Sequence, residues 1–458
     1  MECHSHENLW GDRSLVLATC AIGSPNYAGW EMIRFLYNLL WPLGLLFFLP
    51  GYLVKMFRRG NYRHKFGQRF GIYDVDLRAR LSVQKSTWLH AVSVGEVMIA
   101  LKLAKAIRAL GADARFVLTT TTTTGFAFAS KSAPSWMEIL YTPLDFWPIM
   151  RRAFATIRPA KIVLVEAEVW PNLAAEAHAR RIPLALVNAR LSPRSEKRFR
   201  RFRFFVTPTF RLLDLVCVGE PQDVDRWAAI GVLPDRVQVV GSVKYDPEDI
   251  HVDPTRPERV LRDFGIDRSR PVILGGSTHA GEEEILAEAF LRWRQEFPSI
   301  FLIIAPRHAE RGLEIRRQLD RRGLRVTLRS QPTPTRDPSP DCLILDTTGE
   351  LRDWYGVAGA VFVGKSLTAH GGQNPVEAIA AGKPIVFGPH MENFAMLARL
   401  LIARRGAIEV TSAPELQRAV ADLLRDSSLR ETLVQNARMV LSGHRGATSR
   451  TAALIVDL

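Results

Sequence analysis

The stretch 87–110, TWLHAVSVGEVMIALKLAKAIRAL, decides the fold class. It begins with an apolar run of strand length, 87–92, crosses a short turn, and continues from Val97 with apolar residues at helical spacing. A strand followed by a helix is half of a βαβ unit, in which helices cover the faces of a parallel sheet. The stretch therefore predicts an α/β protein with a parallel sheet.

The same alternation recurs along most of the chain. The first set of expected strands covers 87–92, 115–119, 161–165, 183–188, 215–218 and 237–243. The second set covers 272–275, 301–305, 325–328, 360–363 and 385–387. Between the sets lies DPEDIHVDPTRP, which is rich in proline and aspartate and lacks an apolar period. The pattern predicts two Rossmann-like domains with parallel sheets that face each other across a cleft.

Length and charge narrow the class of protein. A chain of 458 residues exceeds what one hydrophobic core usually organises, and its composition is that of a folded protein. The net charge of +14 indicates an anionic partner, which could be nucleic acid, a phosphorylated substrate or acidic lipid. The four cysteines are too far apart to suggest a disulfide framework or a thiolate zinc site: Cys3, Cys20, Cys217 and Cys342.

One segment departs from the pattern of a soluble protein. The run 35–57 carries a single charge, Lys55, and is long enough to cross a bilayer. Basic residues follow it, so the positive-inside rule predicts that the rest of the chain lies at the cytoplasmic face of the inner membrane. Pro42 and Pro50 interrupt the run, which leaves a kinked or an interfacial helix open.

These observations divide the chain into five parts. Residues 1–31 show no periodicity and are expected to be a disordered or non-native extension, with Met32 as a plausible start; Cys3, His4 and His6 receive no metal-binding role. The other parts are a membrane anchor at 32–58, a first domain at 59–245, a linker at 246–258 and a second domain at 259–458, whose last helix is free to pack on the first domain.

Glu96 is the first candidate for chemistry. It follows the first strand, through Ser93, and stands where a helical period begins. A carboxylate at a helix N-terminus facing a cleft can take a proton from an attacking hydroxyl. Spacing alone supports a structural alternative equally well, in which Glu96 is a first-turn glutamate that only complements the helix dipole.

The acceptor side of the cleft is expected at two later strand ends. Glu166 and Glu168 follow the strand 161–165 and share a direction if the backbone stays extended. Either one could instead cap the next helix. Asn188 and Arg190 end the following strand and supply polar groups to the same rim, and Ser93 is expected on this acceptor side as well.

A basic and aromatic segment, RSEKRFRRFRFF at 194–205, has the densest positive charge in the chain. Such a segment suits a surface that lies on anionic lipid or holds a phosphorylated acceptor. An ordinary solvated helix with rings facing the core is an equal alternative, and nucleic-acid binding is a weaker one.

The second domain carries the features of a nucleotide site. Gly275–His279 follows a strand and precedes a helix, so its backbone amides could cradle a phosphate. The next strand ends in Arg307 and His308, and a guanidinium suits a phosphate or a carboxylate. The candidate residues in these two loops are Gly276, Ser277, Thr278, Arg307 and His308.

The most specific motif is GGQNPVEA at 371–378. Glycines allow a nucleotide to approach the backbone closely, and Glu377 stands at the right distance to bind both ribose hydroxyls. Gly372, Asn374 and Glu377 are therefore expected to bind the donor.

We expect no metal site. Asp74–Asp76 and Asp223–Asp225 match a DxD pattern, but the first precedes the sheet and the second lies in a helical segment, where side chains at i and i+2 diverge. The histidines at 279, 308, 370 and 390 lack mutual ligand spacing.

Taken in order, SVGE, EAEVWPNL, NARLSPRS, GSVKYD, GGSTH, APRH and GGQNPVEA resemble the motifs of the transferases of 3-deoxy-D-manno-octulosonic acid (Kdo) that begin lipopolysaccharide core assembly. The resemblance runs from about Met32 almost to the C-terminus. It implies the two-domain GT-B architecture with an N-terminal membrane anchor, CMP-Kdo as donor, a lipid A precursor as acceptor, and no metal or other cofactor.

Residue by residue, the resemblance implies that Glu96 deprotonates a glucosamine hydroxyl of lipid A, with inversion at the Kdo anomeric carbon. Glu168 would support the acceptor, and Lys244 in GSVKYD would lie near the carboxylate or phosphate of the donor. Ser277, Arg307, His308, Asn374 and Glu377 would bind CMP. Anionic membrane lipids are the other expected partner, nucleic acid is not, and the number of Kdo units, the acceptor acylation and the oligomeric state stay open.

Two other classes of protein compete with this interpretation. A basic membrane scaffold without enzymatic activity would explain the charge and the anchor, but it would not need two sets of cleft-lining motifs. Another membrane-associated GT-B enzyme, a lipid-linked amino-sugar transferase or a nucleotide-sugar epimerase, would need both sets and would differ in its nucleotide.

Overall fold

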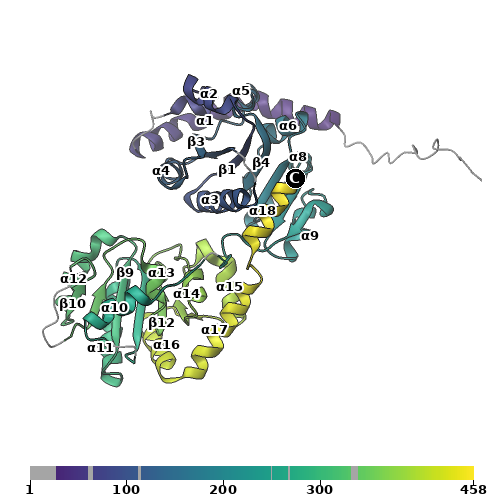
Figure 1. The fold of residues 1–458 in the computed structure, drawn as a ribbon. Helices are drawn as coiled ribbons and strands as arrows, with labels where there is room; N and C mark the ends of the chain where they lie inside the picture. Colours follow the sequence, from purple (N-terminus) through teal and green to yellow (C-terminus); the bar gives the residue numbers. More distant parts are fainter. Residues whose placement is uncertain (1–26, 60–64, 112–114, 249, 267–268, 332–338) are drawn as a thin grey trace, which may run out of the picture.

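The structure, a computed structural model, describes residues 27–59, 65–111, 115–248, 250–266, 269–331 and 339–458. These residues form two α/β domains, one above the other in Figure 1. Each domain is built on a seven-stranded sheet in which all paired strands run parallel. The predicted fold class, two Rossmann-like domains with parallel sheets, is confirmed.

The N-terminal sheet has the order β3-β2-β1-β4-β5-β6-β7. Its strands are β1 (Ser86–Ala91), β2 (Arg115–Thr120), β3 (Met137–Tyr141), β4 (Pro159–Val165), β5 (Leu184–Ala189), β6 (Leu215–Val218) and β7 (Val237–Val239). The helices of this domain are α2 (Val75–Ser82), α3 (Val94–Ala109), α4 (Thr123–Ser132), α5 (Trp147–Ile157), α6 (Pro171–Ala179), α7 (Pro193–Arg201), α8 (Arg203–Phe210) and α9 (Gln222–Ala228).

The C-terminal sheet has the order β10-β11-β9-β8-β12-β13-β14. Its strands are β8 (Val272–Thr278), β9 (Phe301–Pro306), β10 (Val326–Leu328), β11 (Cys342–Ile344), β12 (Ala360–Val363), β13 (Ile385–Phe387) and β14 (Ile408–Glu409). Its helices are α10 (Thr255–Asp263), α11 (Glu282–Glu296), α12 (Gly312–Asp320), α13 (Leu351–Tyr355), α14 (Val376–Ala380), α15 (Ala395–Ala403), α16 (Ala413–Arg425), α17 (Ser427–Ser442) and α18 (Ala447–Asp457).

Helices cover both faces of each sheet, so each domain has two hydrophobic clusters, one on either side of its strands. The central strands are buried along their whole length because parallel strands have no solvent face. The differences from the expected elements are local. Helix α10 begins inside the predicted linker, β7 ends at Val239, and β8 continues to Thr278.

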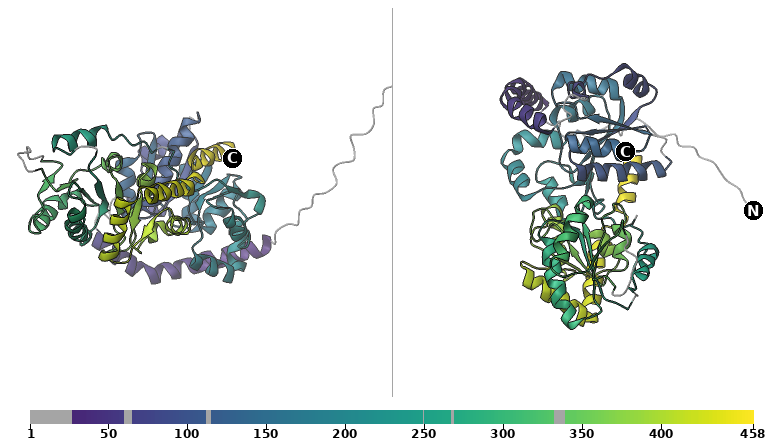
Figure 2. Two further views of the ribbon diagram at one scale, coloured as in Figure 1. Left: turned by 90° about the horizontal axis from the view of Figure 1, so that it is seen from below. Right: turned by 90° about the vertical axis from the view of Figure 1, so that its left-hand side faces the viewer.

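Helix α1 (Tyr27–Arg59) lies along the outer side of the N-terminal domain (Figure 2). It is held there by polar contacts: Arg34 and Asn38 donate to the Asn172 side chain at the start of α6, both at 3.0 Å. The Tyr37 hydroxyl donates to the buried Asp145 carboxylate at 3.1 Å. Helix α1 is therefore docked on the domain that carries the expected acceptor side.

Much of the rest of α1 presents apolar side chains to solvent. The exposed apolar residues are Met32, Phe35, Leu36, Leu39, Leu40, Leu43, Leu46 and Phe47. Among the residues that the structure describes, no helix, α1 included, is both long enough and apolar enough to cross a membrane. Residues 27–31, assigned above to an N-terminal extension, belong to α1, whereas Cys3, His4 and His6 lie outside the described residues.

The chain passes from one domain to the other twice, and hydrogen bonds to Asp246 connect the two segments that make the passage. The first crossing leads from β7 into the C-terminal domain, and in the second α18 returns to pack against α3 (Figure 1). The buried Asp246 carboxylate accepts hydrogen bonds from the backbone N–H groups of Gly446 at 3.0 Å and Thr448 at 2.8 Å. This carboxylate therefore caps the helix that returns to the N-terminal domain.

We predict that Asp246→Asn destabilises the protein by about 2–3 kcal/mol, since an amide nitrogen cannot accept from the α18 amides and one buried donor loses its partner. Burial alone would raise the pKa of Asp246, but the hydrogen bonds from Thr448 and its neighbours bring that pKa below the usual 3.8. The carboxylate thus stabilises the fold above pH 3.8, and its contribution is lost as the pH falls through the lower folded-state pKa.

Urea unfolding of wild-type and variant protein at pH 7 measures this difference. The matched control is Asp235→Asn, an exposed aspartate outside the α18 contacts, for which we expect little change. Equal stability of the two variants would contradict the capping role of Asp246.

Candidate active site

The candidate site lies where the carboxyl ends of the two sheets meet, the edge at which ligands bind in open parallel sheets. A small cavity of about 50 Å³ opens there between the domains. Its N-terminal-domain residues include Glu166, Asn188 and Arg190, and the C-terminal domain contributes Met396 and His444. Four of the residues expected at the cleft therefore line one cavity: Glu166, Asn188, Arg190 and Lys244.

Four non-glycine residues at or just after the ends of the cleft strands have left-handed backbone conformations. Their φ values are 67° for Glu166, 49° for Asn188, 54° for Ser277 and 58° for Lys365. This conformation costs about 1–2 kcal/mol for a residue with a Cβ atom. Such strain concentrates at functional sites, where the surrounding structure holds a side chain in place. The four positions mark β4, β5, β8 and β12 as the strands that build the site.

Glu96 stands in the first turn of α3, as expected, and takes part in a reciprocal N-terminal cap. Its carboxylate accepts hydrogen bonds from the Val92 N–H and from the Ser93 hydroxyl, both at 2.8 Å. The Ser93 hydroxyl accepts in turn from the Glu96 N–H at 3.4 Å. This arrangement is a capping box, so the structural interpretation of Glu96 is present in the fold. Ser93, expected on the acceptor side, is the N-cap residue of α3.

The same carboxylate is electrostatically coupled to other groups of the cleft. Burial raises the pKa of Glu96 above its usual 4.5, the hydrogen bonds from Val92 and Ser93 oppose this shift, and the carboxylates of Glu166 and Glu168 add to it. Burial likewise raises the pKa of Glu168. Three acidic side chains from the ends of β1 and β4 therefore lie close enough to influence one another.

Lys244 faces these carboxylates from the segment after β7. Burial lowers the pKa of Lys244 below its usual 10.5, and Arg190 acts in the same direction, whereas Glu166 and Glu96 oppose it. The Lys244 ammonium donates to the backbone carbonyl of Asn393 in the C-terminal domain at 2.7 Å. Lys244 therefore contacts one domain while its charge is balanced by carboxylates of the other.

Asn188 has a structural partner within the site. Its side-chain oxygen accepts from the Ser242 hydroxyl at 2.8 Å, and the Ser242 N–H lies 3.2 Å from His444 Nδ1. Ser242 belongs to the GSVKYD segment, whereas His444 lies 202 residues away along the chain. Spacing could not identify His444 as a site residue, because nothing near it in the sequence carries a motif.

In the C-terminal domain, Glu282 changes the interpretation of the Gly275–His279 turn. Its side chain is fully buried, and one oxygen accepts from the Ser366 and Leu367 N–H groups at 3.0 and 3.1 Å. The other oxygen accepts from the Lys365 N–H at 2.8 Å and from the His279 N–H at 2.9 Å. One backbone amide of the turn, that of His279, and three amides of the loop after β12 are therefore occupied by a carboxylate of the protein.

The other residues of this turn divide between the protein interior and the cleft side. Thr278 was expected to bind the donor, but it is fully buried and its hydroxyl donates to Glu283 at 3.0 Å. Gly276 is buried as well, and a Cβ atom there would lie 2.6 Å from the Tyr355 hydroxyl, so the glycine serves packing. Ser277 is partly exposed and keeps the strained backbone described above.

Arg307 and His308 are both exposed directly after β9. The His308 ring lies 6.0 Å from the His279 ring, and its Nδ1 atom is 3.4 Å from Glu310. These two side chains remain available to an anionic ligand at the carboxyl end of the sheet.

The GGQNPVEA segment forms a loop between β12 and α14. Gly372 has a φ of 67°, and a Cβ atom there would lie 2.5 Å from the Met391 sulfur, so the space beside this glycine is filled by the protein. Asn374 is exposed, and its side chain accepts from the Val376 N–H at 3.1 Å, which caps α14. Glu377 is partly exposed at the start of α14, 3.7 Å from Arg352.

One expectation about the histidines is wrong. His370 and His390 were judged to lack mutual ligand spacing, but the loops after β12 and β13 bring their rings to a centroid distance of 3.9 Å. Both lie beside the Glu392 carboxylate. The spacing along the chain gave no sign of this, since the two loops meet only in the folded domain.

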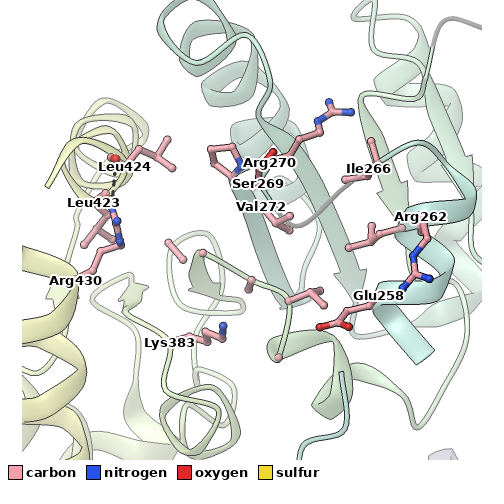
Figure 3. A pocket seen from close by; sticks show the side chains of 17 residues that line it. Glu258, Arg262, Ile266, Ser269, Arg270, Val272, Lys383, Leu423, Leu424 and Arg430 are labelled. Carbon is pink, nitrogen blue, oxygen red and sulfur yellow. Dashed lines mark hydrogen bonds between the residues drawn. The ribbon is translucent and has the colours of Figure 1, made fainter. Parts of the chain in front are cut away.

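A second, larger pocket is not part of this site. It has a volume of about 650 Å³ and lies at the amino ends of β8 and β12, the opposite edge of the C-terminal sheet. Figure 3 shows its basic side chains, Arg262, Arg270, Lys383 and Arg430, together with Glu258. The strand-end residues with a left-handed backbone and the carboxylates of Glu96, Glu166 and Glu168 all lie at the carboxyl ends of the strands.

Comparison with known proteins identifies the family of the chain. The family described as 3-deoxy-D-manno-octulosonic-acid transferase (kdotransferase) matches residues 64–247. The 3-deoxy-D-manno-octulosonic acid transferase of Bordetella pertussis is 33% identical over 388 residues, which cover 83% of this chain and 89% of the relative. The enzyme of that name from Haemophilus influenzae is 30% identical over 396 residues, 86% of this chain and 91% of the relative.

A solved structure supports the architecture independently. The Anabaena protein HepE, crystallised in complex with UDP, superposes with a TM-score of 0.53 at 15% identity, over 82% of this chain and all of that one. At this identity the likeness concerns the fold, which is the two-domain GT-B arrangement. With carboxylates and a lysine gathered at the interdomain cleft, and with relatives that match most of its length, the chain belongs to the family of 3-deoxy-D-manno-octulosonic acid transferases and is a Kdo glycosyltransferase.

Proposed function

We propose that the protein transfers Kdo from CMP-Kdo to a hydroxyl of a lipid A precursor, with inversion at the anomeric carbon and with Glu96 as the general base. The observation that carries this proposal is the position of Glu96 in the first turn of α3, directly after β1, where the Val92 N–H and the Ser93 hydroxyl hold its carboxylate at 2.8 Å. A buried carboxylate with a raised pKa is a stronger base than an exposed one. The acceptor glucosamine would approach from the side of Glu168 and Arg190.

The proposed step is a single displacement. The acceptor oxygen forms a bond to the anomeric carbon of Kdo as the bond from that carbon to the phosphate oxygen breaks. CMP leaves with the electron pair, and the hydroxyl proton passes to Glu96. The hydrogen bonds from Val92 and Ser93 fix the orientation of the carboxylate, and each of its oxygens retains a second lone pair for the proton.

We predict that Glu96→Gln lowers the rate of transfer by at least about 100-fold, since an amide cannot take the proton. Turnover of CMP-Kdo with a lipid A precursor measures the effect. The matched control is Glu288→Gln on the exposed side of α11, which should leave the rate unchanged. Because Glu96 also caps α3, thermal unfolding of both variants checks that a loss of activity is not a loss of fold.

The pH dependence distinguishes a base from a cap. Activity of the wild type should fall on the acidic side as pH drops through the raised pKa of Glu96, above 4.5. Ser93→Ala removes a hydrogen bond that lowers this pKa, so the acidic limb should move to higher pH. Glu166→Gln removes a neighbouring charge that raises it, so the limb should move to lower pH. If neither substitution shifts the acidic limb of the pH–activity profile, the result contradicts the role of Glu96 as general base.

We propose further that the reaction needs no metal ion. Lys244, Arg190 and Arg307 are cations at or near the cleft, and cations of this kind can stabilise the departing phosphate and the Kdo carboxylate. Because Glu282 occupies the backbone amides of His279 and of residues 365–367, these side chains would carry most of the charge stabilisation. Ser277, His308, Asn374 and Glu377 are the candidates for holding the rest of CMP.

Transfer is therefore expected to proceed at an unchanged rate in excess EDTA. Lys244→Ala, by contrast, should lower the rate in the presence or absence of the chelator, because it removes a cation that faces the donor. The amount of CMP released, measured with and without EDTA, tests both expectations. A rate restored only by added magnesium would overturn the metal-independent mechanism.

We also propose that the enzyme works at the cytoplasmic face of the inner membrane, with α1 and α8 against the lipid. Phe202, Phe204 and Phe205 are each about half or more exposed at the start of α8, while Arg198, Arg200 and Arg201 precede them. Helices α1 and α8 both pack on α6, so the two exposed apolar surfaces belong to one domain. Aromatic rings beside arginines favour insertion into an anionic lipid surface.

We predict that the triple substitution of serine for Phe202, Phe204 and Phe205 weakens binding to vesicles that contain phosphatidylglycerol by at least about tenfold. Co-sedimentation with the vesicles measures binding. The matched control replaces Leu313 and Met439, exposed apolar residues of the C-terminal domain, with serine and should bind as the wild type does. Equal binding of the two variants would place the membrane contact elsewhere.

A further inference from the structure

His370, His390 and Glu392 form a cluster of metal-ligating side chains that the proposed reaction does not use. His370 Nδ1 lies 3.0 Å from Glu392 Oε1, and His390 Nδ1 lies 3.5 Å from the same oxygen. The potential ligand atoms of the three residues all lie within 4.8 Å of one another. Two metal–ligand bonds of about 2.1 Å span at most about 4 Å, so small rotations of the side chains suffice to place all three around one ion.

Backbone hydrogen bonds hold the two loops that carry these residues together. The His390 N–H donates to the Ser366 carbonyl at 3.0 Å, and the Asn393 N–H donates to the Gly371 carbonyl at 2.9 Å. The Gly371 N–H donates to Glu392 Oε2 at 2.6 Å and orients the carboxylate. The positions of the three ligands are therefore set by the backbone as well as by the side chains themselves.

The chemistry of the three ligands selects the ion. Two imidazole nitrogens and one carboxylate oxygen are ligands typical of Zn²⁺, whereas Mg²⁺ prefers oxygen ligands and retains several waters. His370 and Glu392 are exposed and His390 is partly exposed, so an ion could enter from solvent and keep open positions for water.

We propose that His370, His390 and Glu392 bind one Zn²⁺ ion, which joins the loop after β12 to the loop after β13. Asn393, the residue next to Glu392, accepts the hydrogen bond from Lys244 of the N-terminal domain. The ion therefore restrains the loop on which this interdomain contact rests. It takes no part in the transfer reaction, and the inference does not depend on the identity of donor or acceptor.

Zinc titration of the full-length chain, in competition with a chromophoric chelator, tests the proposal. The titration is made in a background with Cys3→Ser, His4→Ala and His6→Ala, because a thiol and two imidazoles near the N-terminus can bind zinc by themselves. We expect one equivalent of Zn²⁺ to bind with micromolar or tighter affinity. His370→Ala and His390→Ala should each weaken binding by at least about tenfold.

His251→Ala, an exposed histidine of the interdomain segment, is the matched control and should bind zinc as the background protein does. Co²⁺ provides a second readout, since ligation by the cluster gives visible absorption bands that both histidine variants should lose. Zinc should also raise the unfolding temperature of the background protein but not that of the variants. Binding that His370→Ala leaves unchanged, or less than one equivalent in the background protein, would overturn the proposal.

These measurements contain neither donor nor acceptor, so their failure would leave the proposed transfer reaction untouched. Conversely, a chain that binds zinc at this cluster but transfers no Kdo would overturn the reaction and not the metal site. The EDTA experiment connects the two, because transfer should survive removal of the ion.

Discussion

The hydrogen bonds between Asp246 and the first turn of α18 are the interaction on which the rest of the arrangement depends. The carboxylate comes from the segment that leaves the N-terminal domain, and the amides belong to the helix that returns to it. Both crossings of the chain are thus fixed at one point, beside Lys244 and Ser242.

A second buried carboxylate, Glu282, organises the C-terminal half of the cleft. By accepting from the backbone of residues 365–367 and from His279, it joins the loop after β12 to the loop after β8. Loop amides that a carboxylate of the protein already satisfies are not free to bind a phosphate.

The sequence was sufficient for the architecture because the strong strands are buried on both faces and stand out as continuous apolar runs, as β6 and β12 do. Strands β11 and β14 were missed, whereas β10 and β13, which are as short as β11, were predicted, so length alone does not explain the omission of β11. Strand β3 was missed as well, and its partly buried residues include the charged Glu138.

Within the site, position at a strand end was enough to single out Asn188, which lines the interdomain cavity, whereas Lys244 came from the resemblance to the family. The direction in which such a residue points could not be predicted. The Thr278 side chain contacts Glu283 in the interior, and Tyr355 fills the space beside Gly276. Nor could contacts between distant loops be predicted, such as those that bring His370 to His390 or Ser242 to His444. These depend on packing between segments that share no local pattern.

The strained backbone at Glu166, Asn188, Ser277 and Lys365 has a consequence for protein engineering. Glycine at such a position would relax the chain and make it easier to fold, so a search for heat-tolerant variants is drawn toward these four residues. Each of them also carries a side chain at an edge of the cleft. Selection for robustness and selection for turnover therefore oppose each other at these positions, and heat tolerance is better sought on the outer helices.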